Sequence, residues 1–77
     1  MLQLRPNCEC CDRDLPPDAE AWICSYECTF CPECAARTEQ VCRNCGGDLV
    51  LRPVRPPHRL AKDPASTVRV HAQAPCA

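Results

Sequence analysis

The stretch Cys24-Ser25-Tyr26-Glu27-Cys28-Thr29-Phe30-Cys31-Pro32-Glu33-Cys34 places four cysteines within eleven residues. Cys24 and Cys28 enclose three residues, and Cys31 and Cys34 enclose two. A gap of this size lets one tight turn direct both sulfur atoms at a single metal ion. The stretch therefore predicts two ligand pairs of a metal-binding domain.

Two further pairs flank this stretch. Cys8 and Cys11 precede it, Cys42 and Cys45 follow it, and each pair again encloses two residues. Eight ligands in four pairs fill two tetrahedral sites, so the sequence predicts two structural Zn²⁺ ions. A segment this short buries too little apolar surface to offset its ordering entropy, whereas each structural zinc can contribute about 10 kcal/mol to folding. We therefore expect a small metal-stabilised α+β domain.

Two other chemistries use clustered cysteines. Disulfides belong to oxidising compartments, but the N-terminus lacks the apolar run of a secretory signal, and no stretch is long enough to span a bilayer. We therefore expect a cytoplasmic protein with reduced thiols and no membrane association. An iron–sulfur cluster is the second alternative, because Cys28, Cys31 and Cys34 have the two-residue gaps of bacterial ferredoxins. The next cysteine of that pattern is missing, since position 38 is Thr.

The four pairs can combine in two ways. A sequential arrangement joins neighbouring pairs, whereas a cross-brace joins alternate ones. Only seven residues separate Cys34 from Cys42, which is cramped for a second sequential finger and suits one short helix. The spacing favours the cross-brace, in which site 1 consists of Cys8, Cys11, Cys31 and Cys34, and site 2 of Cys24, Cys28, Cys42 and Cys45.

Local patterns predict a few short elements. Residues 21–30 have the β-favouring residues of a small hairpin, and residues 48–51 of a final strand. Residues 32–41 predict a helix, with Pro32 suited to its first turn. We expect the two-zinc domain to span residues 1–52. Residues 53–77 are rich in proline and arginine without apolar periodicity, which predicts a disordered tail.

Charge is distributed unevenly between these two parts. Residues 1–50 contain four Arg against nine acidic residues, a net charge of −5, whereas residues 51–77 have a net charge of +4. Four thiolates on one Zn²⁺ leave about −2 per site, which would bring the domain to about −9. Such a domain is a poor surface for phosphate backbones, so nucleic acid could be bound only through the basic tail.

The order of the spacings falls within the RING-type pattern of eight ligands, with Cys28 where that pattern usually has His. The closer resemblance is to domain-of-unknown-function family 1272, an uncharacterised, mostly bacterial family of short cysteine-rich proteins. It covers residues 1–53 and is carried by the motifs Leu4–Asp12 (LRPNCECCD), Asp14–Pro17 (DLPP), Glu27–Cys31 (ECTFC) and Asn44–Gly47 (NCGG). The resemblances imply metal binding and a RING-like or treble-clef cross-brace, but no established activity.

Three positions argue against the ubiquitin-ligase activity that RING domains are known for. RING ligases resemble one another in an apolar residue after the first ligand, where this chain has Glu9. They often have proline after the seventh ligand and a cationic residue after the last, where this chain has Arg43 and Gly46. We therefore do not expect the surface that binds a conjugating enzyme.

The remaining reactive residues have simpler interpretations. Cys10 is a spare thiol or alternate ligand of the first pair, or else a redox-sensing thiol. Cys76, His58 and His71 are expected to be solvated residues of the tail. No general base, open metal position or phosphate-binding loop is recognisable.

We therefore expect no enzymatic activity. The sequence predicts a monomeric zinc-binding module that acts as a protein-interaction adaptor. The alternatives are a nucleic-acid-associated zinc protein that binds through its tail, and a redox or zinc sensor that uses Cys10.

Overall fold

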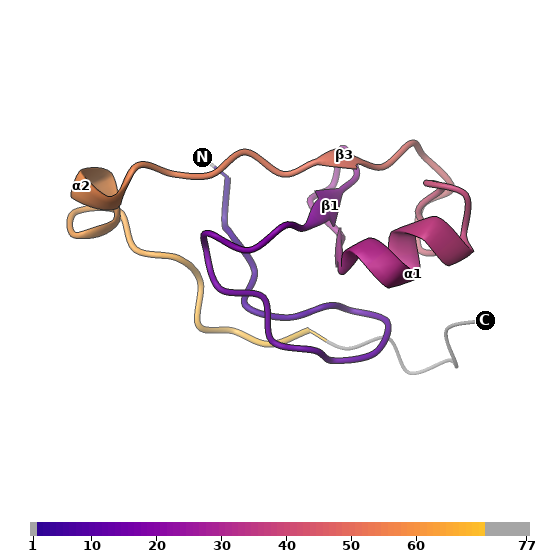
Figure 1. Cartoon of the computed structure of the whole chain (residues 1–77), viewed down its shortest axis with the longest axis horizontal. Helices are drawn as coiled ribbons and strands as arrows, with labels where there is room; N and C mark the ends of the chain where they lie inside the picture. Colours follow the sequence, from indigo (N-terminus) through magenta and orange to yellow (C-terminus); the bar gives the residue numbers. More distant parts are fainter. Residues whose placement is uncertain (1, 71–77) are drawn as a thin grey trace.

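Short elements joined by tight turns make up the structure, a computed structural model that describes residues 2–70 (Figure 1). It contains the strands β1 (Trp22–Ile23), β2 (Thr29–Phe30) and β3 (Val50–Leu51), and the helices α1 (Pro32–Arg37) and α2 (Pro57–Leu60). Within the described residues, neither helix has the length or apolar character needed to cross a membrane.

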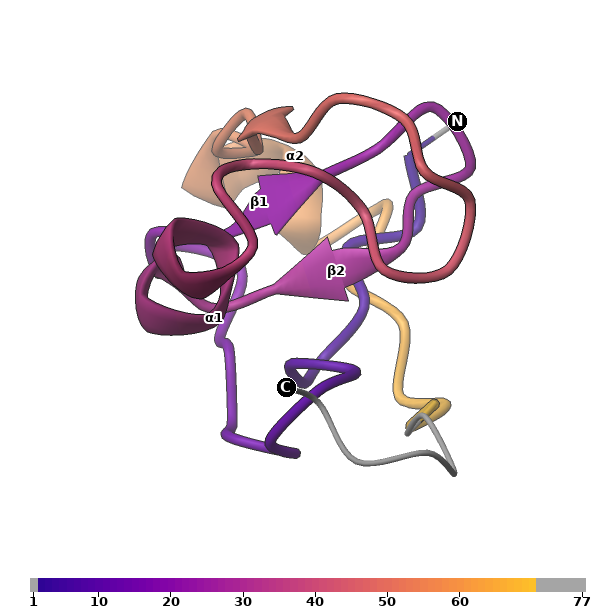
Figure 2. The same ribbon diagram turned by 90° about the vertical axis from the view of Figure 1, so that its right-hand side faces the viewer.

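The three strands form one antiparallel sheet in the order β2-β1-β3. Trp22 of β1 lies opposite Phe30 of β2 on one side and Leu51 of β3 on the other. The pairing of β1 with β2 confirms the hairpin predicted over residues 21–30. Figure 2 shows these two strands side by side, with α1 beside them.

Helix α1 is shorter than the predicted helix over residues 32–41. Its end lies at Arg37, because Glu39 and Gln40 adopt the left-handed backbone conformation, with φ of 55° and 63°. This turn lets Val41 pair with Asp48 in an isolated antiparallel bridge. The chain can thereby reverse direction immediately before Cys42.

The last strand and the helix count also differ from the prediction. Of the predicted strand over residues 48–51, only Val50–Leu51 pairs with β1, since Asp48 pairs with Val41. The structure also has a second helix, the single turn α2, which the sequence analysis did not predict. Pro57 lies in the first turn of α2. N–H groups in a first turn have no partner within the helix, so proline loses no hydrogen bond there.

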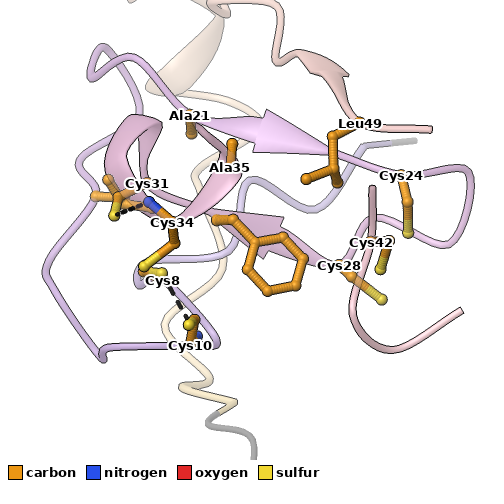
Figure 3. Close-up of a cluster of buried hydrophobic side chains, with 12 residues drawn as sticks. Cys8, Cys10, Ala21, Cys24, Cys28, Cys31, Cys34, Ala35, Cys42 and Leu49 are labelled. Atoms are coloured by element: carbon orange, nitrogen blue, oxygen red, sulfur yellow. Dashed lines mark hydrogen bonds between the residues drawn. The ribbon is translucent and has the colours of Figure 1, made fainter. Parts of the chain in front are cut away.

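Cysteine dominates the buried core. Seven of the twelve residues in the largest buried cluster are cysteines, packed with a few small and apolar side chains (Figure 3). The non-cysteine members are Leu15, Ala21, Phe30, Ala35 and Leu49. Trp22 packs against this cluster from a partly buried position. Trp22 and Phe30 therefore both contribute to the interior.

A buried carboxylate ties the N-terminal turn to the sheet. Glu9 is 2% exposed, and its Oε2 accepts hydrogen bonds from the Thr29 N–H at 2.6 Å and from Arg5 Nη1 at 2.7 Å. Its Oε1 also accepts from Asn44 Nδ2 at 3.5 Å. One carboxylate thus joins three segments that are distant in sequence.

A buried arginine closes the other side of the domain. Arg52 is 3% exposed, and its guanidinium donates to the carbonyls of Arg5 at 3.0 Å and Pro16 at 3.1 Å. Its backbone N–H donates to Ala21 O at 2.7 Å. Burial lowers the pKa of Arg52 from its usual value. Arg52 therefore holds the end of the β3 segment against the N-terminal half of the chain.

Residues 53–70 run back toward the N-terminal segment, which Figure 1 shows as the yellow chain near the indigo one. Arg55 donates to the carbonyls of Leu2 and Asp63, and the Ser66 N–H donates to Gln3 O. The predicted domain boundary at residue 52 and the disorder of the tail stay predictions. In this structure, the first part of the tail contacts the domain.

We expect Glu9→Ala to lower the free energy of unfolding by about 2–4 kcal/mol, because it leaves the Arg5 guanidinium and the Thr29 N–H without their buried acceptor. Urea unfolding of the purified protein measures the change. Glu33→Ala is the matched control: Glu33 pairs with Arg13 at 3.6 Å in an exposed position, and its loss should cost less than about 0.5 kcal/mol. Equal effects of the two variants would contradict the assigned role of Glu9.

Candidate metal centre

Four cysteines from two distant pairs meet in the first cluster. The sulfur atoms of Cys8, Cys11, Cys31 and Cys34 all lie within 4.8 Å of one another. The sulfurs of Cys11 and Cys31 are 3.8 Å apart. Cys11 is exposed and the other three cysteines are buried. The first cluster thus reaches the surface at one sulfur only.

The turn after Pro6 positions the first pair. The Asp12 N–H donates to Cys8 O at 2.9 Å, and the Cys8 N–H donates to Arg13 O at 2.8 Å. Asp12 adopts a left-handed conformation with φ of 63°, which aspartate tolerates better than most residues. The Cys10 N–H points at the Cys8 sulfur, 3.4 Å away. The Cys8 sulfur thus has a backbone N–H donor beside it.

Helix α1 positions the second pair of this cluster. Cys31 is the N-cap of α1, and its sulfur accepts a hydrogen bond from the Cys34 N–H at 3.5 Å. A side chain at the N-cap and one in the first turn lie on the same side of a helix start. The two sulfurs therefore face Cys8 and Cys11 together.

The second cluster contains Cys24, Cys28 and Cys42, whose sulfur atoms also all lie within 4.8 Å of one another. Cys24 and Cys28 flank the hairpin turn, where Glu27 has a positive φ of 64° and donates to Cys24 O at 2.9 Å. In Figure 3, these three sulfurs lie apart from those of Cys8 and Cys34.

Cys45 lies at the edge of the second cluster. A turn closed by the Cys42 N–H to Gly47 O bond, at 2.7 Å, brings Cys45 back beside Cys42. The Cys45 N–H donates to the Cys42 sulfur at 3.5 Å, but the Cys45 sulfur is not in the group whose sulfurs all lie within 4.8 Å of one another. Gly46 has a φ of 78°, which glycine adopts without strain. The structure thus brings all eight predicted ligands to two places, seven of them in tight groups.

Each cluster favours ionisation at one of its sulfurs. Burial acts to raise the pKa of Cys24, but hydrogen bonds from the Tyr26 N–H and with neighbouring sulfurs lower it to about 7. The pKa of Cys31 is also lowered, because the Cys34 N–H and neighbouring sulfurs outweigh its burial. Burial above all raises the pKa of four others, and nearby sulfurs add to the rise: Cys11, Cys28, Cys34 and Cys42. Ionising a whole cluster therefore requires a cation to offset the crowded charge.

The spacing of the sulfurs fits a single tetrahedral ion. Metal–sulfur bonds of about 2.3 Å in a tetrahedron separate the sulfurs by about 3.8 Å. The Cys11–Cys31 distance of 3.8 Å has this value. Sets of soft thiolates suit zinc, iron or copper(I) rather than calcium or magnesium. Both clusters can therefore hold a metal ion.

The other residues that the sequence suggested lie elsewhere. Cys10 is disulfide-bonded and belongs to neither cluster, so in this structure it is not the free thiol or alternate ligand that the sequence predicted. His58 lies exposed on α2, away from the sulfurs. Cys76 and His71 fall outside the described residues.

Sequence reasoning missed the residues that connect the two clusters. Glu9 lies between two ligands of the first cluster, and it contacts Thr29, next to Cys28, and Asn44, next to Cys45. No spacing or composition marks this role. The only sign of this role in the sequence was Glu9 itself, an acidic residue at a position where RING ligases have an apolar one.

The comparisons agree with the resemblance to family 1272. The chain is 62% identical over 79 residues to an uncharacterized protein of Rhizobium meliloti (strain 1021), and the match covers 100% of this chain and 94% of that protein. No solved structure matches the chain. The family model described as "Protein of unknown function (DUF1272)" matches residues 1–55. The paired cysteines and the motifs around them thus confirm that the chain belongs to the DUF1272 family.

Proposed function

We propose that the protein is a non-enzymatic module that binds two structural Zn²⁺ ions and serves as a protein-interaction adaptor. The observation that carries the proposal is the grouping of cysteines from alternate pairs into two clusters. Site 1 is the first cluster, and site 2 is the second cluster with Cys45 as its fourth ligand. Sites with four cysteines are closed, and closed zinc sites stabilise a fold rather than activate water.

Zinc is favoured over an iron–sulfur cluster by the distance between sulfurs. A cluster of several iron and sulfide atoms holds its cysteines further apart than one ion does, and the Cys11–Cys31 distance suits one ion. A cytoplasmic location is supported by eight of the nine cysteines of the described chain, which are free, whereas the disulfide at Cys10 argues the other way.

A protein partner is favoured over nucleic acid by the state of the basic residues. Arg52 and Arg55 donate to backbone carbonyls, and Arg69 is held by two aspartates. Among the described basic residues after residue 51, Arg59 and Lys62 are left for an external phosphate. Two tetrathiolate sites would add to the negative charge of residues 1–50, which disfavours a polyanion.

Exposed apolar side chains at the sheet edge offer a surface for a protein. Strand β3 is the edge of the sheet, and Val50 and Leu51 are 57% and 56% exposed. Val54, just beyond β3, is 57% exposed. Exposed apolar side chains on an edge strand favour contact with another polypeptide. We propose that the module is monomeric and that a different protein covers this edge.

We expect the purified chain to carry two Zn²⁺ ions and to unfold when a strong chelator removes them, since coordination supplies most of the folding free energy. Native mass spectrometry with elemental analysis counts and identifies the metal, and circular dichroism follows the unfolding. Iron in place of zinc, or a folded chain without metal, would contradict the proposal.

We expect Cys45→Ser to lower the zinc content from two ions to about one, because it removes a ligand of site 2. The control is Arg43→Ser, which changes an exposed residue of the same turn and should keep both ions. Elemental analysis after dialysis compares the two variants. Full zinc content in Cys45→Ser would exclude this cysteine as a ligand.

We expect Leu51→Asp to reduce capture of the protein partner from cell extract by at least about tenfold, because it places a charge on the exposed sheet edge. Val68→Asp is the matched control: Val68 is 67% exposed on the tail and should tolerate the change. Quantitative mass spectrometry of the captured proteins provides the measurement. A partner lost equally with both variants, or retained with both, would rule out β3 as the contact surface.

A further inference from the structure

The end of the described tail lies on the turn that carries the first cysteine pair. Arg69 and Val70 contact residues 7–14, more than fifty positions earlier in the chain. The Ser66 N–H donates to Gln3 O at 2.9 Å, which aligns the tail with the N-terminal segment. The protein thus shows how one extended peptide sits against this face.

Asn7 contacts the main chain of that peptide. Its Oδ1 accepts a hydrogen bond from the Val70 N–H at 3.3 Å, and its Nδ2 donates to Val70 O at 2.8 Å. Asn7 is 0% exposed, and Nδ2 is also within hydrogen-bonding distance of Asp12 Oδ1. A paired donor and acceptor of this kind bind an extended backbone whatever side chain it carries, as a neighbouring strand would.

Asp12 and Asp14 contact the side chain of the preceding residue. Arg69 Nη2 lies 2.9 Å from Asp12 Oδ1 and 2.8 Å from Asp12 O, and Arg69 Nη1 lies 2.7 Å from Asp14 Oδ1. A planar guanidinium can donate hydrogen bonds to all these acceptors at once. A lysine ammonium lacks this fork of donors and would act mainly as a point charge. The face therefore distinguishes arginine from other side chains.

Residues 66–70 are held here by hydrogen bonds and ion pairs, which a competitor can replace. Arg69 is exposed, Val70 is 40% exposed and Val68 is 67% exposed, so little apolar surface is buried at this end. Exposed ion pairs are individually weak. The occupancy depends mainly on the tail being part of the same chain, which gives it a high effective concentration.

We propose that Asn7, Asp12 and Asp14 form a docking site for an extended peptide that carries arginine, and that residues 66–70 occupy this site in cis. A partner protein with an arginine in an extended segment displaces the tail. The inference rests on the proposed adaptor function and adds the chemistry of one partner. Asn7 and Asp12 directly flank Cys8 and Cys11, so the site exists only while the first cluster is assembled.

The test uses the full metal-loaded chain and a fluorescein-labelled peptide with the sequence of residues 64–70, Pro-Ala-Ser-Thr-Val-Arg-Val. Fluorescence anisotropy measures its binding. We expect Arg69→Ala to bind the peptide about threefold to tenfold more tightly than the unaltered chain, because the competing tail is weakened. Arg59→Ala, which changes an exposed arginine of the same tail, should behave like the unaltered chain.

A second arm tests the aspartates and the peptide's arginine. Adding Asp14→Asn to Arg69→Ala should abolish the gain, and so should replacing arginine by alanine in the peptide. Asp14 is 81% exposed at its side chain, so this change should leave the fold and metal content intact. Equal binding by the unaltered chain and Arg69→Ala, or binding that ignores the peptide's arginine, would overturn the proposal.

The two proposals fail in different ways. If the docking site is wrong, the zinc content and the Leu51-dependent capture of a partner are still expected. Failure of the adaptor function would abolish that capture without changing the binding of a purified peptide.

Discussion

Convergence of cysteine sulfurs is the constraint on which the rest of this structure depends. Strands of two residues and a helix of six are too short to be stable alone. Few apolar side chains are available to hold them, and most of the buried cluster is cysteine. Crowded thiols attract one another weakly, so a shared cation is the simplest source of the missing free energy. Under the proposed coordination, the metal ions take the role of an apolar core.

Much of the local structure could be predicted, because the number of residues between two paired cysteines also limits the turn that can join them. Two cysteines separated by three residues imply a hairpin turn, and Cys31 followed by Pro32 implies a helix start. The cramped interval before Cys42 also favoured the grouping of alternate pairs that the sulfurs adopt. These features depend on neighbours in the sequence, so the sequence alone is sufficient to predict them.

The features that escaped prediction depend on contacts between distant segments. Helix α1 ends early because Val41 pairs with Asp48, which no helix propensity encodes. Glu9 and Arg52 are charged residues that would normally be assigned to the surface, but both are buried and hydrogen-bonded across the domain. Glu9 in particular departs from the RING pattern, and here its carboxylate holds three segments of the domain together.

The interleaving of the two clusters has a consequence for biosynthesis. Each cluster takes cysteines from both the early and the late part of the domain. The first group is incomplete until Cys34 has left the ribosome, and the second until Cys42 has followed. No fragment that ends before Cys34 contains a full set of thiols for either cluster, so the nascent chain emerges with several of them exposed to stray metals and oxidants. Under the proposed coordination, the metal supply late in synthesis therefore decides whether the domain folds.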